Sequence, residues 1–245
     1  MKLRIRFSKF GPVKFVGHLD MMRFFQKAIK ASGLPVKYTE GFSPHQVLSF
    51  AAPLGVGTQS ESEYCDLELT EEENIASYFE PLNEQMCEGL TVRGFYVLPP
   101  KAKNAMASVQ GASYRIEFKD DEVKEKLAAA VERFGESEEV LYEKETKTGI
   151  KTRNLKEAVY EIKEEDGVLK FTCDASSGGN LKPAALLQGL FEPYGTLLNP
   201  WDYHLIREEV YTGNDEGKLV PLYDGLEVLI DDGSSIFLCK TFENS

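Results

Sequence analysis

Two hydrophobic periods open the chain. Over residues 2–8 apolar and basic residues alternate: Leu3, Ile5 and Phe7 would lie on one face of a strand, and Lys2, Arg4 and Arg6 on the other. This alternation predicts a half-buried strand with a basic face in solvent. The apolar spacing then becomes helical, at Leu19, Met22, Phe25 and Ile29, which predicts a helix from about His18 to Ser32. Gly33 and Pro35 end that helix.

The next elements follow in the order of a split β-α-β unit. Short apolar or alternating runs predict strands near 47–51, 63–69 and 90–98. Thr70 with Glu73 forms a capping box, which predicts a helix over about 71–86. The order strand–helix–strand–strand–helix–strand indicates a ferredoxin-like domain over residues 1–98.

The pattern then repeats after a polar, Pro-led segment at 99–111, which is typical of a linker. Strands are predicted at 114–118, 140–144, 158–162, 168–173 and 203–207, with helices at 121–134 and 182–191. Apolar runs at 226–230 and 236–239 predict an added hairpin. We therefore expect an α+β protein: two ferredoxin-like (βαββαβ) units in tandem, the second over 112–210, with a C-terminal β-hairpin extension over 211–245.

Charge is distributed unevenly along the 245 residues. The net charge is −12, yet residues 1–50 hold nine Lys/Arg against two acids, or +7, and residues 51–100 hold one Arg against ten acids, or −9. This asymmetry predicts one basic face on an acidic body, to which any nucleic acid would be restricted. The alternative is that the two segments neutralise each other across one sheet.

The basic segment also carries two of the three histidines, His18 and His45. If the loops 11–17 and 41–45 open at one end of the sheet, turn amides and a helix start could hold a phosphate, and Phe42 could stack on a base. Cations along the predicted helix could follow the phosphate backbone. The candidate binding residues here are Lys9, His18, Asp20, Arg23, Lys27, Lys30, Lys37, Gly41, Phe42, Ser43 and His45.

Further hypotheses concern a phosphate-binding loop, an acid–base pair and a metal site. Gly178 and Gly179, with Lys182 beside them, could cradle a phosphate ahead of a helix, or form only a flexible loop. His18 and His45 could be an acid–base pair for metal-independent RNA cleavage, or structural groups. No metal-ligand spacing is present, and we predict no metal site and no cofactor.

The four cysteines have no CxxC spacing and lie in or beside apolar stretches, so buried structural thiols are expected. No apolar run approaches the length of a membrane span, and the first residues do not have the pattern of a signal peptide. These features predict a cytoplasmic protein without membrane contact.

Several motifs together resemble the radical-SAM-linked protein family, DUF2344. They lie at residues 4–12, 17–23, 33–45 and 54–66, with a looser resemblance from the linker to about residue 191 that includes Arg153. The chain departs from the family in having Gly17 where Ser is usual and Asn154 where an acid is expected. The resemblance implies a role beside a radical SAM enzyme in RNA modification or maturation.

The hypothesis that follows is a non-catalytic recognition or accessory protein. It would bind tRNA or rRNA and act with a radical SAM enzyme in trans, because the chain has no CxxxCxxC motif to hold the cluster. Two alternatives remain: a metal-independent endoribonuclease of the paired ferredoxin-like type, and a protein-binding adaptor without RNA.

Overall fold

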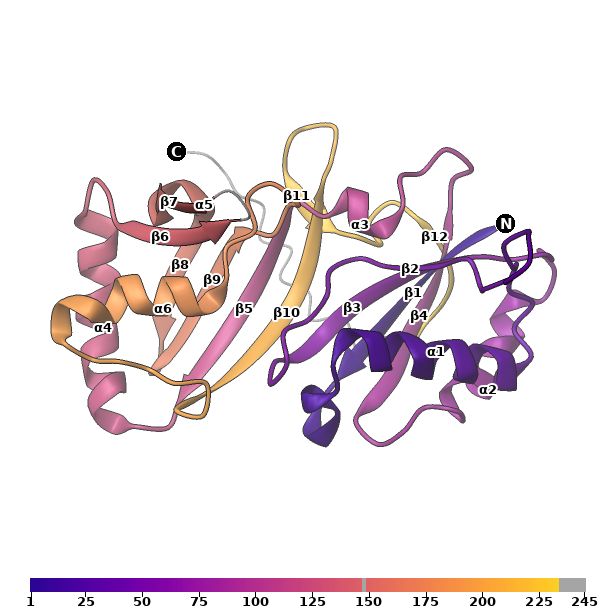
Figure 1. Ribbon diagram of the computed structural model, residues 1–245, viewed down its shortest axis with the longest axis horizontal. Coiled ribbons are helices and arrows are strands. Elements are labelled where there is room, and N and C mark those ends of the chain that lie inside the picture. The colour runs from indigo at the N-terminus through magenta and orange to yellow at the C-terminus, as the bar shows by residue number, and fades with distance from the viewer. Residues whose placement is uncertain (147–148, 234–245) are drawn as a thin grey trace. The chain divides into compact units, whose positions relative to one another are not determined.

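The computed structural model describes residues 1–146 and 149–233 (Figure 1), which form an α+β protein. The chain divides into two compact units: Met1–Val109 together with the segment from Glu209 onward, and Gln110–Glu208. The segment after residue 210, expected as a separate extension, therefore belongs to the first unit. A short helix, α3 (Ala105–Ser108), lies inside the predicted linker.

The first unit is built around an antiparallel sheet with the strand order β12-β4-β1-β3 and the short β2 beside β3. One further strand, β10 (Tyr203–Gly213), crosses the boundary between the units at Glu209. The other elements of this unit are β1 (Lys2–Lys9), η1 (Gly11–Phe15), α1 (His18–Ser32), β2 (Leu48–Phe50), β3 (Gln59–Glu68), η2 (Ile75–Tyr78), α2 (Phe79–Asn83), β4 (Leu90–Leu98), β11 (Leu219–Pro221) and β12 (Glu227–Asp231).

The core of the first unit lies between the sheet and the helices α1 and α2, which cover one of its faces (Figure 1). The predicted bounds of α1 are confirmed, and the helix ends at Gly33 with a φ of 78°. Its buried stripe consists of Met21, Phe25, Ala28 and Ile29. Leu19, expected in that stripe, is 62% exposed because the buried face is centred on Phe25 and Leu19 lies off it.

The predicted helix over 71–86 is wrong in its extent. The structure has the 3₁₀ turn η2 followed by the five-residue α2, and Asn74 has a left-handed φ of 54°. Pro81 explains the late start, because proline is tolerated in the first turn of a helix and disrupts its interior. The helix therefore begins at Phe79, two residues before the proline.

The basic face of β1 is buried, which corrects the expectation of a solvated face. Arg4 and Arg6 are 3% and 2% exposed. The Arg4 guanidinium pairs with Asp66 on β3 at 2.8 Å and donates to the carbonyl of Leu222 at 2.6 Å. The Arg6 guanidinium lies 5.4 Å from the centre of the Tyr223 ring. The segment after β11 therefore covers this side of the sheet, which the period-two pattern could not reveal.

The second unit has the strand order β10-β5-β9-β8 and a separate hairpin of β6 and β7. Its helices α4 and α6 share one core with the sheet (Figure 1). The predicted strand at 140–144 is thus part of a side hairpin. The elements are β5 (Gly111–Phe118), α4 (Asp121–Glu136), β6 (Leu141–Thr146), β7 (Gly149–Asn154), α5 (Leu155–Ala158), β8 (Val159–Glu165), β9 (Val168–Asp174), α6 (Pro183–Phe191) and η3 (Glu192–Tyr194).

The cysteines agree only in part with the expectation of buried thiols. Cys65 and Cys173 are buried, and burial raises the pKa of Cys173 to about 12. Cys87 is exposed, because it follows α2 in the turn that leads into β4. Cys239 and the predicted strand at 236–239 lie outside the described residues. Within the described ranges, no helix is long and apolar enough to cross a membrane.

Candidate functional site

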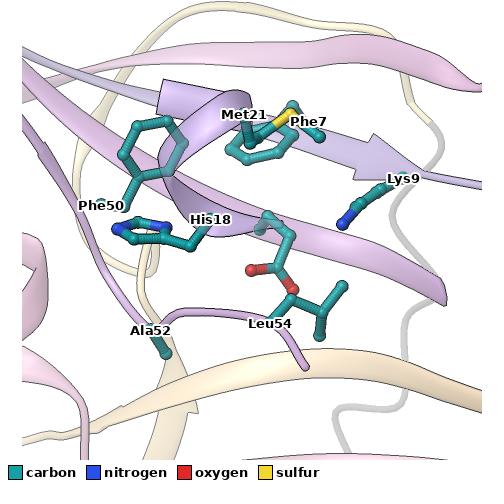
Figure 2. Close-up of a pocket in the computed structure, with 8 residues that line it drawn as sticks. Phe7, Lys9, His18, Met21, Phe50, Ala52 and Leu54 are labelled. Carbon is teal, nitrogen blue, oxygen red and sulfur yellow. The ribbon is translucent and has the colours of Figure 1, made fainter. Parts of the chain in front are cut away.

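A small hollow lies in the first unit between the ends of β1 and β3, the start of α1 and the segment after β2 (Figure 2). Its free space is about 20 Å³, enough for one water-sized group. The half-buried lining residues His18, Ala52 and Leu54 bring the hollow to the surface. The full lining is Phe7, Lys9, His18, Met21, Phe50, Ala52, Leu54 and Glu63.

Two buried charged residues line this hollow. Phe7 and Glu63 are directly opposite each other on β1 and β3, and Lys9 follows Phe7 beyond a register shift. Lys9 is 3% exposed and Glu63 is 5% exposed. The Lys9 ammonium donates to the carbonyl of Val16 at 2.9 Å, which fixes the turn that leads into α1. Charged side chains are rarely buried unless they are paired or hydrogen-bonded.

The hollow unites Lys9 and His18, two of the predicted site residues. His18 is the first residue of α1, and its ring meets the Phe50 ring edge-on at 5.5 Å between centroids (Figure 2). The preceding residue, Gly17, is the N-cap and forms no side-chain cap hydrogen bond. The amides of the first helical turn therefore lie beside the hollow without a side-chain cap.

The loop at 41–45 forms a separate site, the tip of a hairpin over residues 37–47. The Thr39 amide donates to the His45 carbonyl at 2.8 Å, and the Thr39 hydroxyl contacts Nδ1 of His45 at 3.1 Å. The buried Gln46 side chain donates to the carbonyl of Gln26 on α1 at 3.0 Å. Phe42 at the tip is fully exposed, at 111%. The lining of the hollow includes His18 and no residue of this loop, so His45 does not line the hollow.

Three of the nine cations of residues 1–50, namely Arg4, Arg6 and Lys9, are buried and do not contribute to an exposed basic face. Neutralisation by acids of the segment 51–100, the alternative considered above, holds for Arg4 with Asp66 and for Lys37, which pairs with Glu68 at 3.2 Å.

Three cations of α1 are exposed. Arg23 forms an exposed pair with Asp20 at 3.1 Å. Lys27 and Lys30 are exposed, and no ion pair among the described residues engages either of them. The Gln46–Gln26 hydrogen bond joins the hairpin to α1, and we call Tyr38 and Phe42 of the hairpin with Lys27 and Lys30 of α1 the aromatic–basic surface.

The glycine-rich loop of the second unit is closed on itself. The Asp174 carboxylate accepts a hydrogen bond from the Ser176 amide at 2.7 Å, and the Gly179 amide donates to the Ser176 hydroxyl at 3.1 Å. A Cβ on Gly179 would lie 1.6 Å from an Asp174 carboxylate oxygen, so only glycine fits. Lys182 is exposed at the N-cap of α6, and Gly178 has open space around it. A carboxylate at the centre of the loop repels a phosphate, so we do not include this loop in the proposed function.

Sequence reasoning missed Glu63, although its position carried a signal. Side chains alternate between the two faces of a strand, and Glu63 falls on the same face of its strand as the inward-facing Cys65 and Leu67. In the same way, Lys9 falls on the face of Ile5 and Phe7. A charged residue on the apolar phase of a strand is either at an end or buried for a reason. Glu209, by contrast, left no such signal, and its contact with Tyr64 at 2.6 Å exists only in the folded chain.

The comparison with known families places the chain. A family model described as "Uncharacterized protein conserved in bacteria (DUF2344)" matches residues 2–183, most of the chain. The chain belongs to the DUF2344 family. The predicted resemblance to DUF2344 is thereby confirmed. No curated protein matches the chain.

The DUF2344 match covers both candidate features of the first unit, the hollow and the hairpin over 37–47. It ends before the segment that supplies Glu209, Leu222 and Tyr223 to the buried face of the same unit. In this DUF2344 protein, within residues 1–146 and 149–233, no group of three or more His, Cys, Asp or Glu side chains is arranged to hold a metal ion.

Proposed function

We propose that this protein is a recognition module that binds single-stranded RNA through the aromatic–basic surface of its first unit. The observation that carries the proposal is Phe42, which is fully exposed on a hairpin held by its own hydrogen bonds. In the free protein the fully exposed Phe42 ring gains no free energy from apolar burial. Unstacked bases of single-stranded RNA are a partner that such a ring fits.

The neighbouring helix supplies the charge that such a partner needs. The hairpin is tied to α1 at Gln26, the residue immediately before Lys27 and one helical turn before Lys30. Two exposed lysines on the helix to which the aromatic hairpin is bonded match the pattern of single-strand binding sites, in which cations follow the backbone and rings stack on the bases. The ring of Tyr38, 44% exposed, lies on the same hairpin as Phe42.

We also propose that each of the two units has the ferredoxin-like topology. The order β4-β1-β3-β2 with α1 and α2 as the two connections is the order of a ferredoxin-like unit, and β10-β5-β9-β8 with α4 and α6 repeats it. Sheets of this topology often bind RNA, but fold alone does not assign function. We infer two ferredoxin-like units, with β6 and β7 inserted into the second.

The role we infer for the bound RNA is presentation to a radical SAM enzyme. The resemblance noted from the sequence supports this role, and the absence of a CxxxCxxC motif means that a partner must supply the cluster. The nuclease alternative relies on His18 with His45; His18 lines the hollow, and the Nδ1 atom of His45 contacts the Thr39 hydroxyl of its own hairpin.

The test is binding of a labelled, unstructured RNA followed by fluorescence anisotropy at several salt concentrations. Phe42→Ala should weaken binding by about 5-fold or more, because stacking contributes about 1–3 kcal/mol per base. Lys27→Glu with Lys30→Glu should weaken binding and reduce the salt slope by about 1.4, at roughly 0.7 per phosphate contact.

The control is Lys101→Glu with Lys103→Glu, which makes the same change in net charge on two exposed residues of the first unit, in the segment between β4 and α3. It should bind as the unaltered protein does. Equal losses in the two double variants would show that only net charge matters, and a Phe42→Ala protein with full affinity would exclude the stacking surface. Co-purification of a radical SAM enzyme without RNA would favour the adaptor alternative.

A further inference from the structure

We propose that the outer face of the sheet in the first unit is a second stacking site for single-stranded RNA, which residues 222–231 of the same chain cover as an internal competitor. We call residues 222–231 the strap; it leads from β11 to the edge strand β12 (Figure 1). The inference takes from the proposed function only that the ligand is RNA. The site includes none of the four residues of the aromatic–basic surface.

The outer face is the side of β1 that carries Arg4 and Arg6. The apolar residues that alternate with them belong to the core shared with α1, on the other side of the sheet. On the neighbouring strand β4, Tyr96 is opposite Arg4, and Gly94 is opposite Arg6. One face of the sheet therefore brings an aromatic ring next to two guanidinium groups.

Gly94 gives Tyr96 the position of a stacking platform. The two residues are two positions apart on β4 and so share one face. A Cβ on Gly94 would lie 2.7 Å from the Tyr96 hydroxyl oxygen and 2.9 Å from the ring atoms Cε2 and Cζ. The ring therefore lies across the glycine. Its outward side is open to stacking, because the Tyr223 ring of the strap stacks on it.

Tyr223 takes the place that we assign to a base. Its ring centre is 5.1 Å from that of Tyr96, and the two ring planes differ by 19°. The Arg6 guanidinium lies 5.4 Å from the centre of the same Tyr223 ring. Proteins hold unpaired bases on aromatic rings and on guanidinium planes. A base that replaced Tyr223 would therefore meet both kinds of partner.

The polar groups of the strap are also of the kinds that a nucleotide offers. The Asp231 carboxylate lies 3.5 Å from the Arg6 guanidinium and accepts a hydrogen bond from the Tyr96 hydroxyl. The Leu222 carbonyl accepts from the Arg4 guanidinium at 2.6 Å. Phosphate oxygens and base carbonyls are acceptors of the same kinds. The strap thus brings a ring, an anion and a carbonyl group to the residues that would bind RNA.

The platform keeps its own support when the strap leaves. Arg4 retains its ion pair with Asp66, and Arg6 retains its hydrogen bond to the Ser62 hydroxyl at 2.9 Å. Both of these partners lie on β3, within the sheet. The guanidinium groups therefore stay oriented, and each exchanges its contacts with the strap for contacts with RNA.

The strap has the features of a segment that opens locally. Leu222 is the one buried residue among residues 222–231, all of which the structure describes. β12 lies at the edge of the sheet, and its pairing with β4 shifts register between Val228 and Ile230. Segments with few buried apolar contacts open at a lower free energy than global unfolding requires. The DUF2344 match, over residues 2–183, includes the platform and ends before the strap.

The experiment opens the strap in a protein from which the three substitutions given above have removed the aromatic–basic surface. Adding Tyr223→Ala with Asp231→Ala gives the opened protein. It should bind the labelled, unstructured RNA about 5-fold or more tightly than the same protein with the strap unaltered, the effect of one stacked base. The matched control is Glu227→Ala, which makes the same charge change at an exposed residue of the strap and should give no gain.

Two substitutions of Tyr96 assign the gain to the platform. In the opened protein, Tyr96→Leu should abolish the gain, because it keeps apolar volume without a ring, and Tyr96→Phe should retain it. Circular dichroism checks that each variant is folded. Hydrogen exchange of the unaltered protein is a second measurement that needs no variant. Saturating RNA should speed the exchange of the amides of residues 222–231, because RNA displaces the strap.

The outcomes separate the two proposals. The second site would be overturned by a folded opened protein without a gain, by an equal gain in Glu227→Ala, or by a gain that survives Tyr96→Leu; each leaves the aromatic–basic surface standing. If the opened protein does not fold, strap exchange that RNA leaves unchanged would overturn the second site. RNA binding by the opened protein and none by the unaltered protein would refute the aromatic–basic surface and support the platform.

Discussion

Replacing Glu209 by glutamine should remove a pH dependence from the stability of the first unit. The Glu209 carboxylate accepts hydrogen bonds from the Tyr64 hydroxyl at 2.6 Å and from the Val210 amide at 2.8 Å. Burial of this carboxyl nevertheless dominates and raises its pKa to about 7, from the ordinary glutamate value of 4.5. The folded protein therefore holds this proton more tightly than the unfolded chain does.

The sign and size of the effect follow from linkage. Because the pKa of Glu209 is raised in the folded state, the protonated carboxyl contributes most to the free energy of unfolding below pH 4.5. That contribution is lost as the pH rises through about 7. Between pH 6 and pH 8 the loss is at most about 1.3 kcal/mol from these two values. Part of the Glu209 residue reaches the surface, so solvent screening reduces this figure.

Urea denaturation at pH 6 and pH 8 measures the effect. The free energy of unfolding of the unaltered protein should fall by up to about 1.3 kcal/mol from pH 6 to pH 8 on account of Glu209. In Glu209→Gln this part of the fall should be absent. Glu216→Gln is the control, because it makes the same charge change at a side chain that is 70% exposed. An unchanged pH dependence in Glu209→Gln, or one that Glu216→Gln also removes, would refute the reasoning.

Asp66→Asn should destabilise the protein by about 3–5 kcal/mol, because it leaves the buried Arg4 guanidinium without its charged partner. Lys37→Met removes an exposed pair and should cost at most about 1 kcal/mol in the same denaturation experiment; equal losses would contradict the burial argument. Gly89→Ala should lower stability by about 1–3 kcal/mol, since φ is +90° there and a Cβ would lie 2.2 Å from the Phe10 carbonyl oxygen. A Gly89→Ala protein with unchanged thermal unfolding would show that this turn relaxes without strain.

Local patterns determined the elements whose own residues decide their structure. α1 runs from His18 to Ser32 as predicted, because apolar spacing and a terminal glycine are both encoded within the helix. β4 at Leu90–Leu98 was likewise predictable from a single run. The predicted helix over 71–86 was wrong in its extent because the prediction did not take account of Pro81, which restricts α2 to five residues.

In the candidate sites too, the sequence suggested some residues, and the folded chain was needed to show how they are exposed or brought together. Phe42 could be proposed from its Gly41–His45 setting, but only its full exposure on a hydrogen-bonded hairpin makes it a stacking surface. The sequence suggested Lys9 and His18 as site residues, while the hollow between them also needed Glu63 from β3. Contacts between distant strands depend on register, which one sequence does not reveal.

The sequence by itself determined the α+β class, the first helix, most strands and the concentration of cations in the first fifth of the chain. Only the tertiary structure decided which of those cations meet solvent. The alternation that places Arg4 on the polar face of β1 is the same whether water or the distant segment at Leu222 covers that face. Burial is a property of what packs against a residue, and that partner comes from another part of the chain.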